Sequence, residues 1–112
     1  PVTLILAHMG GWRQWDQVEA LLPQSSVLLD TAFSYGDLTP LEDTLFGDQL
    51  HMMEQEQFVR FVRKFGARRL LFGTDSPWGD QSADVASIRA LPLSPEERDA
   101  ILGGNAQRLL GL

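Results

Sequence analysis

Two side chains of this sequence, His8 and Asp75, could together carry out metal or acid–base chemistry. Each comes at or shortly after the end of an apolar run that predicts a buried strand. Parallel strands place their carboxyl ends at one edge of a sheet, where α/β proteins bind ligands, so we expect both side chains at a shared rim. An imidazole and a carboxylate there could ligate a divalent metal ion or act as an acid–base pair. Taken singly, each could instead be an ordinary hydrogen-bonded loop or turn residue.

Other residues near these strand ends admit both a functional and a structural interpretation. Asp30 follows the apolar Val27–Leu29 and needs a partner, which could be a ligand or simply neighbouring backbone amides. The Gly10-Gly11 pair could let the backbone approach a substrate and leave helix N-terminal amides free for an anion, or it could only form a turn. His51 stands at a predicted helix start in an acidic region, which favours a surface or capping role.

The three tryptophans could line a site or fill the core. Trp12 and Trp15 fit a helical apolar stripe, and tryptophans at such a spacing are usually core residues. Trp78 is the best candidate for a ring that faces a substrate, because it follows the loop that carries Asp75.

These residues must be positioned by strands that alternate with helices. Apolar runs with β-branched residues predict strands at Pro1–Ala7, Ser26–Thr31 and Arg69–Phe72. Helical periodicity predicts helices over Trp12–Leu22, His51–Phe65 and Ala83–Leu91. The acidic stretch Leu41–Leu50 is ambiguous between a loop and a loop with a helical turn.

The C-terminal part of the sequence predicts more helix. A capping box at Ser94–Glu97 starts a helix that we expect to end at Gly103-Gly104, and Asn105 then caps a last turn or two over Ala106–Leu110. The resulting order, βαβαβα with two terminal helices, predicts an α/β fold with parallel strands and right-handed crossovers. With no linker in sight, we assign residues 1–112 to a single domain.

Composition excludes several classes of function. The net charge of −6 argues against binding nucleic acid or an anionic membrane surface. The lack of cysteine excludes disulfide scaffolds, cysteine-ligated metals and cysteine nucleophiles. No apolar run approaches the ~20 residues of a membrane span and no signal peptide opens the chain, so we expect a cytoplasmic protein. The start at Pro1, directly in a strand-like run, indicates a piece of a longer protein.

Three segments resemble the C-terminal part of the amidohydrolase-2 family, which comprises TIM-barrel metal-dependent hydrolases and decarboxylases. LILAHMGGW, at Leu4–Trp12, is similar to the family's sixth-strand histidine and Gly-Gly pair. RLLFGTDSPW, at Arg69–Trp78, is similar to its eighth-strand signature, and ILGGNAQRLLGL, at Ile101–Leu112, to its closing helix. SVLLDTAFSY between them looks like the seventh strand. The resemblance covers the whole chain in order and implies strands six to eight of a (β/α)8 barrel.

The resemblance also implies roles for individual residues. Asp75 would contact a divalent metal ion and handle the proton of the metal-bound water. His8 would ligate a second ion, or orient the water or the substrate. Trp12, Tyr35 and Trp78 would line the substrate pocket. Zinc is the ion that we expect, with manganese or another divalent ion as alternatives.

Part of the family's metal site has no counterpart here. The first-strand His-x-His pair and the fifth-strand histidine are missing, and the sequence has only two histidines. Two candidate ligands do not make a catalytic zinc site, which normally uses three protein ligands. We therefore expect the chain to be inactive alone and to need the N-terminal remainder of the barrel as a partner, with a small molecule as substrate. The exposed sheet edges of a partial barrel also favour a homo-oligomer.

Two other interpretations stay open. One is a self-contained small α/β binding or interaction module in which His8 and Asp75 are structural. The other is a metal hydrolase of another TIM-barrel branch, deoxyribonuclease-like or phosphotriesterase-like. Those branches share the eighth-strand aspartate, but the glycine pair after His8 and the Asn105-Ala106 ending fit them less well.

Overall fold

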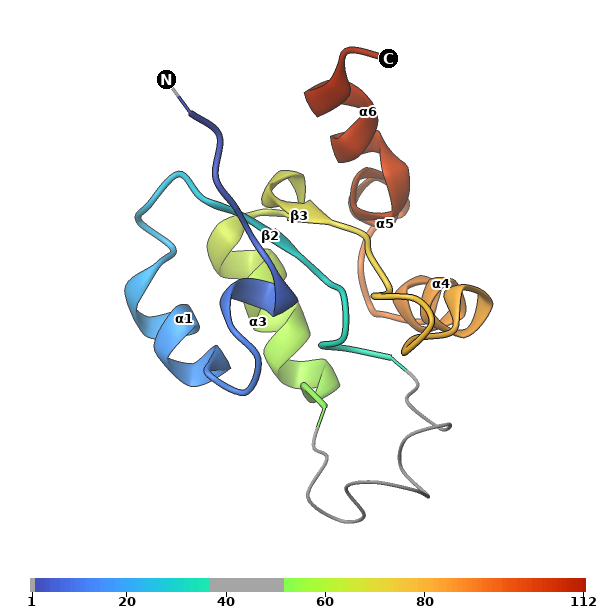
Figure 1. Cartoon of the computed structure of the whole chain (residues 1–112), viewed down its shortest axis with the longest axis horizontal. Helices are drawn as coiled ribbons and strands as arrows, with labels where there is room; N and C mark the ends of the chain where they lie inside the picture. The colour runs from blue at the N-terminus through green and yellow to red at the C-terminus, as the bar shows by residue number, and fades with distance from the viewer. Residues whose placement is uncertain (1, 37–51) are drawn as a thin grey trace.

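The strands form a parallel sheet, as the alternation of strands and helices predicts. The structure is a computed structural model that describes residues 2–36 and 52–112. Within these residues the sheet has three strands in the order β1 (Ile5–Leu6), β2 (Leu28–Asp30) and β3 (Leu70–Leu71), all parallel. The register sets Leu29 beside Leu6 on one side and beside Leu70 on the other (Figure 1).

The helices follow the strands along the chain. They are α1 (Trp15–Leu21), α3 (Gln55–Phe65), α4 (Gln81–Arg89), α5 (Pro95–Asp99) and α6 (Asn105–Leu110). A tight turn with positive φ values covers His8–Gly10, a short 3-10 turn covers Ala67–Arg69, and a π-helical segment covers Ala100–Gly104. The ambiguous stretch 41–50 and His51 lie outside the described residues.

The core lies on one face of the sheet. α3 packs there through the four apolar residues of its predicted stripe, all of them buried: Phe58, Phe61, Val62 and Phe65. Leu29 and Leu70 project from the sheet into the same cluster and are fully buried. Gly66 ends α3 at a φ of 90°, which a glycine adopts without a Cβ penalty. In Figure 1, α3 lies behind the strands with α1 and α4 to either side.

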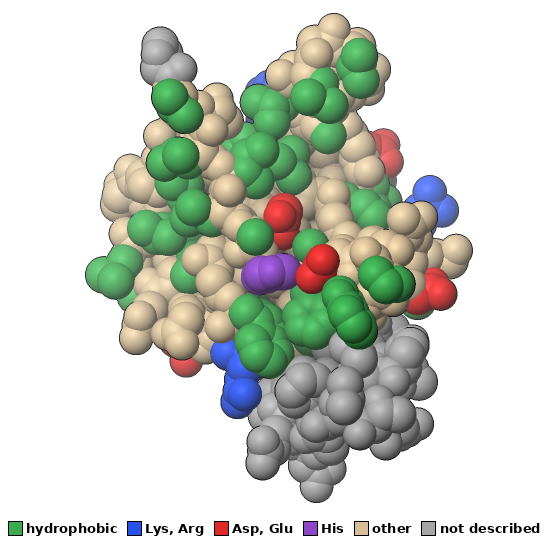
Figure 2. Space-filling model, viewed as in Figure 1, with side chains coloured by type: hydrophobic (Ala, Val, Ile, Leu, Met, Phe, Trp, Pro, Cys, Tyr) green, Lys and Arg blue, Asp and Glu red, His purple; other side chains and the backbone are tan. Residues whose placement is uncertain are grey.

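The other face of the sheet is open toward the viewer in Figure 1. Side chains alternate along a strand, so Ile5 and Leu28, which pair with each other, project away from the core. Ile5 keeps 46% of its surface exposed, and hydrophobic side chains lie across this face in Figure 2. A groove of about 330 Å³ lies at its amino-terminal end, between Val2-Thr3 and Leu109 of α6.

Two predicted boundaries are wrong at the N-terminal end. The first strand covers only Ile5–Leu6 of the predicted Pro1–Ala7, because only these residues lie opposite β2. The first helix begins at Trp15 rather than Trp12, because Gly11 and Arg13 adopt positive φ values of 154° and 63° that no helix allows.

The predicted helix end at Gly103-Gly104 is also wrong. Gly104 keeps helical angles (φ −59°, ψ −40°), and the helix continues through the π-helical segment into α6. The Asn105 backbone N–H donates to the Ala100 carbonyl, five residues earlier. The Asn105 side chain does not cap a helix: it is buried and donates to the carbonyls of Ala67 and Leu70, both at 2.7 Å. These two carbonyls, which lie far from Asn105 in the sequence, fix the position of its side chain, and no local sequence pattern predicts them.

Candidate functional site

His8 is held at the carboxyl end of β1 through three different groups. It is in the left-handed region at a φ of 57°, so the chain turns away from the strand direction there. Its backbone N–H donates to Oδ1 of Asp30 at 2.9 Å, and its carbonyl accepts the indole N–H of Trp15 at 2.9 Å. Its ring nitrogen Nδ1 lies 2.8 Å from the carbonyl oxygen of Ala32.

The contact with Ala32 decides which ring nitrogen is available. A carbonyl oxygen only accepts hydrogen bonds, so Nδ1 must carry the proton of this bond. In a neutral ring the lone pair is then on Nε2, where it can bind a metal ion or take a proton. The ring is half-buried and stands edge-on to Phe33, with the ring centroids 6.2 Å apart.

Asp75 stands in the loop after β3, at the same edge of the sheet. Its φ is 57°, its side chain is exposed, and its carbonyl accepts the backbone N–H of Trp78 at 2.9 Å. Thr31 fixes the start of this loop against the end of β2. Its hydroxyl oxygen accepts the Gly73 N–H at 3.1 Å and donates to the Gly73 carbonyl at 3.3 Å.

His8 and Asp75 therefore share one rim with β2 between their strands, as predicted. Neighbouring strands lie about 4.8 Å apart, which separates the ends of β1 and β3 by roughly 10 Å. The single purple side chain in Figure 2 is His8, and acidic side chains lie beside it on this face. No group of three histidine or acidic side chains that could hold a metal ion occurs in residues 2–36 and 52–112. A metal-binding role for the imidazole of His8 and the carboxylate of Asp75 stays a prediction.

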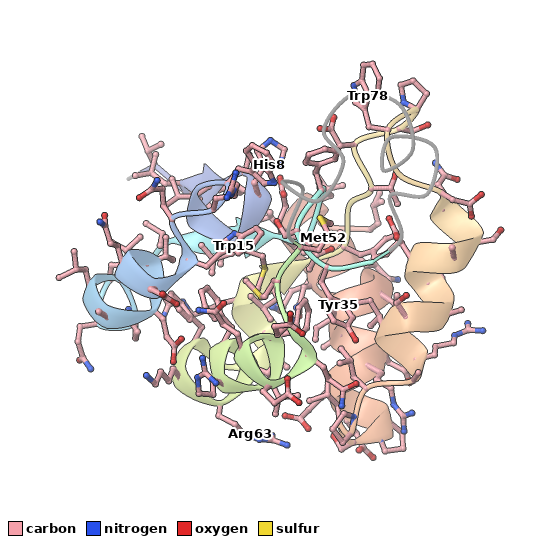
Figure 3. All side chains as sticks on the ribbon, turned by 90° about the horizontal axis from the view of Figure 1, so that it is seen from below. His8, Trp15, Tyr35, Met52, Arg63 and Trp78 are labelled. Carbon is pink, nitrogen blue, oxygen red and sulfur yellow. The ribbon has the colours of Figure 1, made fainter. Side chains whose placement is uncertain are left out.

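The other predicted site residues fall into two groups. Trp78 is half-exposed and lies on the same side of the molecule as His8 (Figure 3). Trp12 packs on Phe33 with 5.7 Å between ring centroids, and its indole N–H is buried without a hydrogen-bond partner in the described structure. Tyr35, by contrast, lies toward α3 in Figure 3, with its ring 5.0 Å from that of Phe58.

The structure thus brings Trp12 and Trp78 to the side of the molecule that carries His8, but not Tyr35. Burial raises the pKa of the Tyr35 hydroxyl, and the negative charge of Glu56 adds to the effect. Trp15 is buried in the core, as expected for most tryptophans in a helical stripe.

Gly10 has a packing reason that the sequence does not reveal. Its φ is 96°, and a Cβ there would lie 2.6 Å from Cγ1 of Val18 in α1. Only glycine lets the turn after His8 press against α1 this closely. Gly11 donates its N–H to the His8 carbonyl at 3.1 Å. A substrate-binding role for this pair stays a prediction.

Sequence reasoning left two features undetected. The Ala32 carbonyl holds the ring of His8, but an alanine carries no signal in its side chain. Asp84 is a buried acidic residue of α4 whose carboxylate fills the space where Gly36 and Gly79 lack a Cβ. Acidic side chains are almost never fully buried unless they are paired, so a buried aspartate is informative. The periodicity of α4 alone, however, could not show which face of the helix is covered.

Comparisons with known proteins agree with this fold. The Amidohydrolase family model matches residues 1–112. No curated protein matches the chain. Among solved structures, it is similar to an amidohydrolase from Burkholderia multivorans with bound zinc, at 20% identity and a TM-score of 0.65, over 98% of this chain and 44% of that one.

Two further structures share the fold. A dihydroxybenzoic acid decarboxylase from a Polaromonas species, with bound manganese and the inhibitor 2-nitroresorcinol, has 19% identity and a TM-score of 0.62, over 98% of this chain and 34% of that one. A putative 2-pyrone-4,6-dicarboxylic acid hydrolase from Pseudomonas putida has 18% identity and a TM-score of 0.64, over 98% and 43%. The chain thus spans less than half the length of these structures.

Proposed function

Because the chain belongs to the Amidohydrolase family, we propose that it forms part of a divalent-metal enzyme whose reaction takes place beside His8 and Asp75. The observation that carries this proposal is the placement of both residues at the carboxyl edge of one parallel sheet, with Nε2 of His8 left free by the bond at Nδ1. The reaction is hydrolysis of a C–O or C–N bond, or a related decarboxylation. Solved structures of similar fold include a decarboxylase and a putative hydrolase.

The exposed carboxylate of Asp75 would take and return a proton at the reacting centre, as a general base and then a general acid. Nε2 of His8 would orient the reacting water or the substrate, or bind metal. The hydrogen bond from Nδ1 to the Ala32 carbonyl restricts rotation of the ring and so holds Nε2 in place. Trp12, whose indole N–H has no hydrogen-bond partner among the described residues, and Trp78, which is half-exposed, would line the substrate side.

The residues present fit a divalent ion as part of its ligand set. An imidazole nitrogen and a carboxylate oxygen suit zinc, which we expect, and also manganese. Structures of similar fold hold zinc in one case and manganese in another. When bound, the ion would lower the pKa of a coordinated water and polarise the substrate.

Two donors leave this site incomplete, so the other ligands must come from a part of the protein outside the described residues. We infer that an N-terminal remainder of the barrel supplies them and that this chain has no activity alone. The substrate is a small molecule. Every helix in residues 2–36 and 52–112 is too short or too polar to cross a membrane. A cytoplasmic location and a homo-oligomer complete the proposal.

Substitution of Asp75 in the full-length protein tests the proposal. Asp75→Asn should nearly abolish turnover on a panel of lactones, esters, amides and aromatic carboxylic acids, because the amide neither takes nor returns the proton. Asp80→Asn is the matched control: it removes a carboxylate from the same loop, and asparagine still caps α4. Near-wild-type turnover by Asp75→Asn would remove Asp75 from the mechanism. His8→Ala should also lower turnover, with loss of bound metal only if the site holds two ions.

A further inference from the structure

We propose that Asp30 is the positioning residue that sets the orientation and the tautomer of His8. One of its carboxylate oxygens accepts hydrogen bonds from the backbone of His8 and from the backbone of Ala32. Ala32 is the residue whose carbonyl accepts the hydrogen bond from the His8 ring. The inference rests on the proposed function, because it concerns how His8 is prepared for its role there.

The contacts converge on a single atom. Oδ1 of Asp30 accepts the backbone N–H of His8 at 2.9 Å and the backbone N–H of Ala32 at 3.1 Å. The Ala32 carbonyl in turn accepts the proton of His8 Nδ1 at 2.8 Å. The donor and the acceptor of the ring's hydrogen bond are therefore both fixed to the same carboxylate oxygen.

Asp30 can reach these amides because of its place in the sheet. Its neighbour Leu29 is fully buried on the core face, so the alternation along β2 turns Asp30 to the open face. There it lies beside the end of β1, where the backbone leaves the strand and the amide of His8 loses its place in the ladder. The carboxylate replaces the strand partner that this amide lacks.

The backbone at His8 needs such support. Its φ of 57° and the φ of 53° at Met9 are in the left-handed region, which non-glycine residues rarely adopt. Without an acceptor for its N–H, this turn would be free to relax toward ordinary angles. The ring would then move away from the Ala32 carbonyl, and Nδ1 would lose the contact that requires it to carry the proton.

A purely structural role for Asp30, which ties two strand ends together, makes a different prediction. It would lower the stability of the protein when lost, but it would leave the tautomer of His8 unchanged in the molecules that stay folded. The tautomer is therefore the property to measure. In ¹⁵N NMR, a protonated ring nitrogen and a bare one resonate far apart, so the tautomer can be read directly.

The experiment uses the full-length protein with ¹⁵N-labelled histidine and with metal removed by a chelator, since a bound ion would itself fix the ring. The pH is set well above the ordinary histidine pKa of about 6.5. His8→Gln assigns the signal. The first variant is Asp30→Ala. If it does not fold, Asp30→Leu takes its place, because leucine has a side chain of similar shape to aspartate. Asp30→Asn keeps an acceptor oxygen. Ser94→Ala is the stability control, because it breaks the capping box of α5 far along the chain from His8.

We expect His8 to be in the Nδ1–H form in the wild type, in Asp30→Asn and in Ser94→Ala. Asp30→Ala or Asp30→Leu should shift it to a mixture rich in the Nε2–H form that free histidine favours. If the site holds two ions and His8 binds one of them, zinc affinity, measured separately by titration, should also fall by about 10–100-fold in the same variants, as is typical when a partner of a metal ligand is lost.

Two results would overturn the proposal. One is an Nε2–H ring in the wild type, and the other is an unchanged Nδ1–H ring in a folded Asp30→Ala or Asp30→Leu variant. Failure of the proposed function looks different: His8→Gln would then keep normal turnover, while the dependence of the tautomer on Asp30 would still be present.

Discussion

Glu19 provides the sharpest test of how the helical layer is held together. This residue of α1 is buried, with 10% of its side chain exposed, and it faces two cations of α3. Its Oε2 lies 2.9 Å from Nε of Arg60 and 2.8 Å from Nζ of Lys64, and its Oε1 accepts a hydrogen bond from Gln57 at 3.2 Å. The bond from Arg60 is the main reason why the pKa of Glu19 falls from 4.5 to about 2, with Lys64 and Gln57 adding to it against the cost of burial.

The lowered pKa can be converted into stability. Each unit corresponds to about 1.4 kcal/mol, so the full shift would give roughly 3.4 kcal/mol. Arg60 and Lys64 keep about half of their side chains exposed, at 51% and 48%. Solvent screens such pairs, and we therefore expect about 1–2 kcal/mol. Because the folded pKa lies below the unfolded one, this stability is fully present above pH 4.5 and is lost as the pH falls toward 2.

Urea denaturation of the wild type and of Glu19→Gln between pH 7 and pH 2 measures this contribution. The variant should unfold with about 1–2 kcal/mol less free energy at pH 7, and the two curves should converge as the pH approaches 2. Glu96→Gln, which removes an exposed carboxylate from the first turn of α5, controls for the loss of one negative charge. Parallel pH profiles for the wild type and Glu19→Gln, or equal stability at pH 7, would show that the pair between α1 and α3 contributes nothing.

Two further substitutions test the loops at either end of the sheet. Arg69→Lys should lower the free energy of unfolding by about 1–3 kcal/mol, because a lysine cannot reproduce the fork that donates to the carbonyls of Val27 at 3.0 Å and Pro23 at 2.8 Å; an unchanged midpoint in thermal unfolding would contradict this. Gly10→Ala should cost about 1–3 kcal/mol, because the new Cβ would meet Val18 at 2.6 Å and φ is 96°. The same Tm for Gly10→Ala and the wild type would mean that this turn can move.

Much of the candidate site follows from local sequence. An apolar run that ends in a polar residue places that residue at a strand end, and parallel strands bring their ends together. His8 and Asp75 could therefore be assigned to one rim without coordinates. For Asp30 the sequence left a choice between a ligand and neighbouring amides, and the structure shows the amides of His8 and Ala32.

The direction of a side chain in a loop follows less easily. Tyr35 comes soon after β2 and resembles a pocket residue in sequence, but its ring packs on Phe58 of α3. Side chains in a loop follow no period. Tyr35 could face the open rim or the apolar face of α3, and α3, which comes later in the chain, decides between the two by its packing. The same holds for Asp84, which is buried because two glycines leave room for its carboxylate.

The sequence by itself determined the order of strands and helices, the apolar stripe of α3 and the rim that carries His8 and Asp75. These follow from patterns that repeat within a few residues, since burial of a strand or of a helix face imposes its own period. Only the tertiary structure decided that Nδ1 of His8 donates a hydrogen bond to the Ala32 carbonyl. It also decided that the Asn105 side chain donates to the carbonyls of Ala67 and Leu70, and that the helix continues through Gly103 and Gly104. Each of these depends on a backbone carbonyl or amide, and every residue has such groups, so no side-chain pattern can mark them in advance.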